Sequence, residues 1–270
     1  LMGLSMARSI RTITSAAEAI EQLEFNTPLH KRSRLREIDD AGQSLDKARG
    51  VLKWFGAYVP RRLVFRLMEL GEEAVASRRR NVTVMFTDIV EFTPQAENLH
   101  EQATADLLNH HFELLGACID DEHGVIDKYI GDSVMAVWGG LSKMEDHADR
   151  AVRAALAIAR VIGEDNAVRR AAGLAPIRVR IGLHSGPAVV GNIGAPGRVN
   201  YTVVGDTVNV AQRFEQLGKE FMVPGDEIIV LVSGDTIAAM IQPKALGILP
   251  KPVLRHVKGR DEPEEVYRLA

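Results

Sequence analysis

Two aspartates, Asp88 and Asp132, stand where predicted strands end. Asp88 follows the mostly apolar tract 82–87, and Asp132 lies between the predicted strands 125–130 and 133–138. Carboxylates on neighbouring strand ends can hold hard divalent cations, which prefer oxygen ligands and often share them with substrate phosphates. Two such ions stabilise both the attacking and the leaving oxygen of a displacement at phosphorus. Either aspartate alone would be read as a turn residue, but two together favour metal-dependent phosphate chemistry.

A second polar group lies in residues 200–213. Asn209 and Arg213 are four apart on the predicted helix 207–221 and therefore share one face. An amide and a guanidinium can hold a ribose and neutralise charge that develops on a phosphoryl group. Standing alone, the pair would be read as the polar face of an amphipathic helix. Asp206 is predicted to cap this helix through the amides of its first turn.

The elements that must position these residues alternate between strands and helices after Asn81. The predicted helices are 99–122, 145–172 and 207–221, with a short one after residue 232. The predicted strands are 82–88, a hairpin over 125–138, 177–184, 188–193, 200–204, 227–232 and a C-terminal hairpin. Mixed strands and helices with adjacent hairpins predict an α+β fold around one sheet.

The first third of the chain is helical and follows a heptad pattern. Its apolar residues recur at spacings of three and four in two series: Met6, Ile10, Ile13, Ala17, Ile20, then Ile38, Ala41, Leu45, Ala48, Leu52, Phe55, Val59. This repeat predicts the seam of a coiled coil or parallel bundle. We expect a dimer that forms a four-helix bundle, because two short helices cannot bury two seams alone. A helical hairpin packed on its own domain is the alternative.

Bulk properties restrict the class of protein. Hydrophobic residues make up 46% and charged residues 26% of the 270 residues, as in soluble globular proteins. The net charge of −3 offers no basic field for nucleic acid. The one cysteine, Cys118, cannot form an intrachain disulfide, which fits a reducing compartment. No apolar run reaches membrane-spanning length. The start at Leu1, without a signal peptide, favours a soluble fragment of a longer protein.

Four tracts together resemble the catalytic domain of class III nucleotidyl cyclases. They are residues 86–93, 128–132, 180–186 and 201–213, in the family's order and spacing. The resemblance implies a ferredoxin-like βαββαβ core within residues 81–270. Residues 1–56 resemble, more weakly, a HAMP signalling module of two parallel helices. Residues 57–80 resemble the transducing helix that joins such modules to cyclases.

The family's metal and purine roles carry over by position. Asp88 and Asp132 match its metal-binding aspartates, and Ile89 would lend a backbone carbonyl, so the resemblance implies two Mg²⁺ or Mn²⁺ ions per site. Lys128 and Thr202 match the purine-specifying positions. Lysine can donate to N1 of adenine, and threonine can accept from the 6-amino group. Guanine-specific relatives tend to have Glu and Cys there, so Lys128 favours ATP.

The remaining roles imply a shared active site. Asn209 and Arg213 match the pair that orients the ribose and stabilises the transition state. Lys258 or Arg260 would contact the triphosphate, and the resemblance leaves the choice between them open. In this family each site takes its metal aspartates from one chain and its purine and ribose contacts from another. Because this chain carries both halves, the resemblance implies a head-to-tail homodimer with two equivalent sites.

Two positions depart from the family's common pattern. Thr202 replaces an Asp found in many relatives, as in a bacterial subgroup often stimulated by bicarbonate. Glu91 replaces a glycine in the loop after Asp88, where the backbone must approach the triphosphate. We expect Glu91 to point outward, because Ile89 and Phe92 must face the apolar interior.

The resulting prediction is an adenylate cyclase, in which the ribose 3′-hydroxyl of ATP attacks the α-phosphate and cyclic AMP and pyrophosphate form. A guanylate cyclase and a catalytically silent dimerising or nucleotide-sensing module are the alternatives. No general base stands out; His184 is expected to be structural, and His110 and His111 to be partly exposed scaffold. Because HAMP modules usually follow a membrane helix, we expect an upstream sensor and anchoring at the cytoplasmic face of the bacterial inner membrane.

Overall fold

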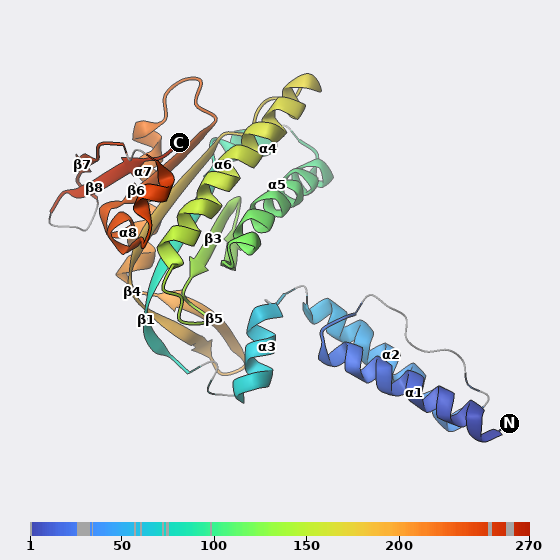
Figure 1. Ribbon diagram of the computed structural model, residues 1–270. Coiled ribbons are helices and arrows are strands. Elements are labelled where there is room, and N and C mark those ends of the chain that lie inside the picture. The colour runs from blue at the N-terminus through green and yellow to red at the C-terminus, as the bar shows by residue number, and fades with distance from the viewer. Residues whose placement is uncertain are drawn as a thin grey trace. The chain divides into compact units, whose positions relative to one another are not determined.

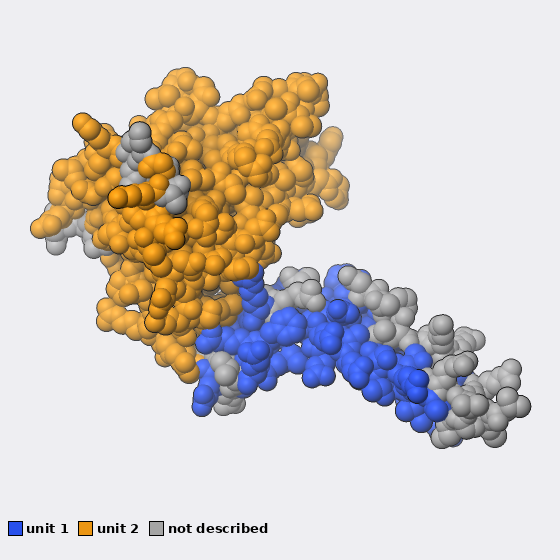
Figure 2. Space-filling model, viewed as in Figure 1, with its two compact units in different colours: residues 1–74 blue, residues 75–270 orange. Residues whose placement is uncertain are grey.

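The computed structural model describes residues 2–25, 33, 35–56, 58–59, 61–71, 73, 76–97, 99–247, 250–257 and 262–270. The chain divides into two units, residues 1–74 and 75–270 (Figure 2). The first unit contains α1 (Met2–Glu21), α2 (Arg36–Gly56) and α3 (Arg61–Leu70). Within the described residues, no helix is long and apolar enough to cross a membrane.

Helices α1 and α2 lie side by side and run in the same direction (Figure 1). Arg49, near the end of α2, donates to the carbonyl of Phe25, just beyond α1, at 2.9 Å. A Cβ built on Gly56, the last residue of α2, would lie 3.2 Å from the Phe25 ring. The C-terminal ends of the two helices therefore meet, which requires a parallel pair. Apolar side chains on both helices stay exposed, among them Ile10 and Leu52.

The second unit is built on one sheet. Its strands are β1 (Arg78–Ile89), β2 (Val125–Ile130), β3 (Ser133–Trp138), β4 (Val179–Ala195), β5 (Arg198–Val204), β6 (Ile228–Ser233), β7 (Val253–Arg255) and β8 (Glu264–Arg268). Their order is β2-β3-β1-β4-β6-β8-β7, and β5 pairs with β4. The helices are α4 (Phe92–Glu97), α5 (Glu101–Asp121), α6 (His147–Ala171), α7 (Asp206–Phe221) and α8 (Gly234–Ala239), with a 3₁₀ turn at Pro243–Leu246.

The succession β1, α5, β2, β3, α6, β4, with the order β2-β3-β1-β4, is the predicted ferredoxin-like core. Helices α5 and α6 cover one face of the sheet (Figure 1), and α7 covers the other. Successive residues of a strand point to opposite faces. In β1, Met85 packs with the α5–α6 layer, whereas Val84 and Phe86 pack with Ala211 of α7.

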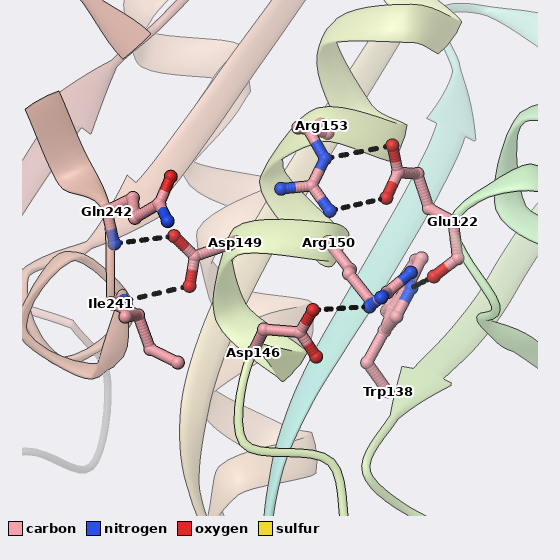
Figure 3. A network of polar contacts seen from close by, with 8 residues as sticks. All are labelled: Glu122, Trp138, Asp146, Asp149, Arg150, Arg153, Ile241 and Gln242. Atoms are coloured by element: carbon pink, nitrogen blue, oxygen red, sulfur yellow. Dashed lines mark hydrogen bonds and ion pairs between the residues drawn. The ribbon is translucent and has the colours of Figure 1, made fainter. Parts of the chain in front are cut away.

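Polar contacts attach α6 to the segments around it (Figure 3). The buried Asp149 accepts from the amides of residues 241 and 242, both at 2.8 Å. Arg153 forms two hydrogen bonds to the carboxylate of Glu122, at 2.9 and 2.7 Å. Trp138 of β3 donates to the Glu122 carbonyl at 3.0 Å. These bonds join α6 to the turn after α5 and to the segment after α8, and they join that same turn to β3.

One prediction about strand continuity and one about burial were wrong. The strands expected at 177–184 and 188–193 form one strand, β4, because Pro187 pairs in register opposite Asn81 without ending the ladder. His111 is fully buried instead of partly exposed, since it shares the inner face of α5 with Leu115 and Ile119. Burial lowers the pKa of His111 to about 4.

Candidate active site

The sheet brings the two predicted metal aspartates together. Strands β1 and β3 are antiparallel neighbours, so the end of β1 lies beside the β2–β3 turn. Gly131, at φ 64°, forms that turn, and Asp132 follows it. The Ile89 amide donates to Oδ2 of Asp132 at 3.0 Å. Asp88, Ile89 and Asp132 therefore occupy one corner of the sheet.

The corner is crowded with negative charge. Burial, together with the nearby carboxylates of Glu215 and Asp132, raises the pKa of Asp88 to about 7, although Arg180 acts in the opposite direction. Arg180, which is almost fully buried, pairs with Asp88 and also donates from Nε to Glu215 at 2.8 Å. Burial also raises the pKa of Glu215. Crowded, desolvated carboxylates of this kind favour a nearby cation.

A cavity of about 530 Å³ opens at this corner. Its lining includes Asp88, Ile89, Asp132, Arg180 and Lys219. The oxygens of the two aspartates and the Ile89 carbonyl are the donors that Mg²⁺ and Mn²⁺ prefer, so these residues fit such an ion. In the part of the chain that is described, no group of three or more His, Cys, Asp or Glu could enclose a metal alone. Further ligands would come from phosphate oxygens and water.

Glu91, at a position where the family has glycine, adopts a backbone conformation that glycine adopts most easily. Its φ is 57°, in the left-handed region, which costs a non-glycine residue about 1 kcal/mol. Its side chain is exposed, as predicted, while Ile89 is buried and Phe92 packs against the core. The charge of Glu91 therefore lies at the rim of the cavity.

Lys128 and Thr202, the predicted purine-specifying pair, are in direct contact. Nζ of Lys128 donates to Oγ1 of Thr202 at 3.1 Å. Asp127 joins them: its Oδ2 accepts from Thr202 at 2.8 Å and lies 3.0 Å from Nζ of Lys128. Strands β2 and β5, which are not paired in the sheet, carry the members of this trio.

Helix α7 carries Asn209 and Arg213. The helix starts at Asp206 with Gly205 as its N-cap, so Asp206 is a first-turn residue instead of the predicted cap. The position still suits it, because negative charge is favourable at a helix N-terminus. Nη1 of Arg213 is buried and has no hydrogen-bond partner among the described residues, while Asn209 is exposed.

Close packing of α7 on β4 positions Glu215. A Cβ built on Gly182 would lie 2.0 Å from the backbone nitrogen of Glu215, so only glycine lets the helix approach this far. The contact places Glu215 against Arg180, two residues before Gly182 on the same strand. The tract 180–186 thus supports the corner formed by Asp88, Ile89 and Asp132, called the metal corner below, through both its arginine and its glycine.

The predicted residues fall into separate groups. Asp88, Ile89 and Asp132 share the 530 Å³ cavity, and the described residues that line it include none of Lys128, Thr202, Asn209 and Arg213. Lys258 and Arg260 lie outside the described residues.

His184 is buried with Nδ1 2.8 Å from Oγ of Ser233, which agrees with the predicted structural role. Sequence reasoning missed Asp127, Arg180 and Glu215 as site residues. Each stands inside or next to a recognised tract, but their partners are distant in the chain.

Comparison with known proteins identifies relatives that are cyclases. The family model "Adenylate and Guanylate cyclase catalytic domain" matches residues 74–238. The chain is 34% identical over 268 residues to "Adenylate cyclase 1" of Rhizobium meliloti (strain 1021), covering 98% of this chain and 39% of that protein. It is 31% identical over 273 residues to "Adenylate cyclase" of Anabaena cylindrica, covering 95% and 52%. The solved adenylyl cyclase CyaB from P. aeruginosa matches with a TM-score of 0.63 and 30% identity, over 72% of this chain and 95% of that chain.

The chain therefore belongs to the family of adenylate and guanylate cyclase catalytic domains, the class III cyclases. Family membership implies the use of divalent metal ions. The chain spans 39% and 52% of the length of the two curated relatives. Because the family description includes both adenylate and guanylate cyclases, membership alone does not choose between ATP and GTP.

Proposed function

We propose that this chain is the catalytic part of an adenylate cyclase. The reaction is attack of the ribose 3′-hydroxyl of ATP on its α-phosphate, which forms 3′,5′-cyclic AMP and releases pyrophosphate. The observation that carries the proposal is the 3.1 Å contact between Lys128 and Thr202, because this pair offers adenine one donor and one acceptor. The adenylate cyclase names of both relatives support the same choice.

Asp88, Asp132 and the carbonyl of Ile89 would hold two Mg²⁺ or Mn²⁺ ions, which lower the pKa of the 3′-hydroxyl and offset the charge of the triphosphate when bound. Arg180 pairs with the Asp88 carboxylate and is itself held by Glu215.

Asn209 and Arg213 act on the ribose and the reacting phosphate. The amide of Asn209 orients the sugar, and the guanidinium of Arg213 stabilises negative charge on the α-phosphate in the transition state. The buried Nη1 of Arg213, which has no hydrogen-bond partner within the described part of the chain, supports this role, because a buried donor without a partner is costly unless a ligand accepts from it. Either Lys258 or Arg260 contacts the triphosphate.

A head-to-tail homodimer completes two equivalent sites. The metal corner and the Lys128–Thr202 pair belong to separate groups within one chain, which supports a site whose second half comes from a partner chain. Residues 1–56 form a HAMP-like helical dimer, and residues 57–80 transmit its state to the catalytic domain, 81–270. The parallel α1–α2 pair and its exposed apolar side chains support this part of the proposal. In this proposal the full-length protein is anchored at the cytoplasmic face of the bacterial inner membrane, and an upstream sensor or transmembrane region supplies the signal.

The test is cyclic nucleotide production from ATP and from GTP, with Mg²⁺ or Mn²⁺, alongside the molecular mass in solution. We expect cyclic AMP to be the main product and activity per chain to rise with protein concentration as dimers form. A preference for GTP would indicate the guanylate cyclase alternative. No turnover of either nucleotide by a confirmed dimer would indicate the silent module.

A further inference from the structure

Asp127 occupies an unusual place beside the predicted purine-specifying pair. Consecutive strand residues normally point to opposite faces, yet Asp127 and Lys128 both contact Thr202. The β2–β3 register shifts between Ile126 and Lys128, which is the irregularity of a β-bulge. Bulges redirect side chains and are frequent next to active sites. The side chain of Asp127 is only 6% exposed. Its contacts with Thr202 and Lys128 compensate for the cost of burying its charge.

We propose that Asp127 is a positioning residue that sets the hydrogen-bond polarity of Thr202 and thereby makes the site select adenine over guanine. The proposal rests on the proposed function, because it takes Lys128 and Thr202 to face the purine. It adds a residue that acts through Thr202 without touching the nucleotide.

Donor and acceptor accounting supports this role. A carboxylate only accepts hydrogen bonds and an ammonium only donates them. The Thr202 hydroxyl lies between the two, 2.8 Å from Asp127 and 3.1 Å from Lys128. Its single proton must therefore go to Asp127, and one of its two lone pairs accepts from Lys128. One lone pair remains, so Thr202 can offer a ligand an acceptor and no donor.

The groups left over match adenine. Lys128 has three N–H donors, and its contacts with Thr202 and Asp127 leave one free. The site thus presents one donor and one acceptor to the N1 acceptor and the 6-amino donor of adenine. Guanine carries an O6 acceptor in place of the amino group. Its O6 would face the Thr202 lone pair, and a buried acceptor left without a donor carries a desolvation penalty.

Without Asp127, this restriction disappears. The Thr202 hydroxyl becomes free to rotate and can donate to O6 of guanine as readily as it accepts from adenine. The penalty on guanine should therefore fall while the metal corner and α7 stay unchanged.

The experiment compares kcat/KM for ATP and GTP in the full chain with Mn²⁺, for the wild type and for Asp127→Asn. Asparagine has the same shape but can donate as well as accept, so it no longer fixes the polarity of Thr202. We expect the ATP:GTP ratio to fall by about tenfold, the size of one good base contact, with a higher KM for ATP. Asp127→Ala, which cannot clash, should give the same fall if the asparagine variant folds poorly.

A matched control and a double-mutant cycle isolate the role. Asp149→Asn also removes a buried carboxylate with two hydrogen bonds, which go to the backbone amides of residues 241 and 242 and to no member of the trio; it should lower stability and leave the ATP:GTP ratio unchanged. In a Thr202→Val background, Asp127→Asn should change the ratio by less than about twofold, because coupled residues are not additive.

Two results would overturn the proposal: an equal loss of kcat/KM for both nucleotides in Asp127→Asn, or a fall in the ratio that persists without the Thr202 hydroxyl. The same ratio can be taken from dissociation constants of non-cyclisable ATP and GTP analogues. A wild type that binds nucleotides but makes no cyclic product would refute the proposed function, and the binding ratio would still decide the role of Asp127.

Discussion

Two inactive variants should restore each other when mixed. Asp88→Ala removes a carboxylate from the metal corner, and Arg213→Ala removes the guanidinium whose buried Nη1 lacks a partner among the described residues. The two residues belong to opposite halves of the proposed shared site. A heterodimer of the two variants then has one site with every residue intact and one site with both defects.

The size of the recovery follows from this arrangement. Loss of one transition-state contact typically lowers kcat by about a hundredfold or more, so each variant alone should retain about 1% of wild-type activity or less. Random exchange of a two-fold dimer in a 1:1 mixture makes about half of the dimers heterodimers, and half of their sites are intact. About a quarter of wild-type activity per chain should therefore return, far above the sum of the parts.

The assay is cyclic AMP production after co-expression of the two variants with different affinity tags. The tags allow the heterodimer to be isolated and its molecular mass to be measured. The matched control mixes Asp88→Ala with Asp132→Ala. Both changes lie in the same half of the site, so every heterodimer site keeps a defect and activity should stay low. An isolated Asp88→Ala/Arg213→Ala heterodimer without activity would refute the divided site, as would full recovery in the control mixture.

Three further outcomes follow from the structure. Burial lowers the pKa of His111 to about 4, so below pH 6.5 this histidine binds a proton in the unfolded chain but stays neutral in the folded chain. The free energy of unfolding should therefore fall by up to about 3 kcal/mol between pH 6.5 and 4. Urea unfolding of His111→Leu should not show this fall. Glu91→Gly should relieve about 1 kcal/mol of backbone strain, although the greater conformational entropy of glycine in the unfolded chain offsets part of this gain. The same change should lower the KM for ATP about twofold, because it removes a negative charge from the cavity rim. Mn²⁺ at a hundredfold excess over its dissociation constant should stabilise the wild type by about 2.7 kcal/mol, seen as a higher Tm, and should not raise the Tm of Asp88→Asn.

Each of these outcomes has a contrary result. An equal loss of stability at low pH in wild type and His111→Leu would assign the titration to other groups. Glu91→Ala keeps the strained Cβ but loses the charge, so it should lower the KM without gaining stability; an unchanged KM in both variants would remove Glu91 from the triphosphate region. A full Mn²⁺ effect on Asp88→Asn would place the ion elsewhere.

The sequence predicted the helices of the catalytic unit well, because their apolar periodicity is a local pattern. The helices expected at 99–122, 145–172 and 207–221 correspond to α5, α6 and α7. The break expected near Pro187 was wrong, because the pairing of β4 with β1 continues through a residue whose local signal favours a turn. The burial of His111 was missed for a similar reason: a helical position is exposed or buried according to what packs on it.

The sequence by itself determined which residues the proposed chemistry uses: Asp88 and Asp132 at strand ends, Lys128 with Thr202, and Asn209 with Arg213. These residues stand in short tracts whose spacing is set by single strands, turns and helices. Only the tertiary structure decided how their charges and hydrogen bonds are held. Arg180 meets Asp88 across 92 positions of sequence, and Asp127 meets Thr202 across 75. Such contacts depend on strand order, on a bulge in β2 and on the close approach of α7 at Gly182, which no local pattern contains.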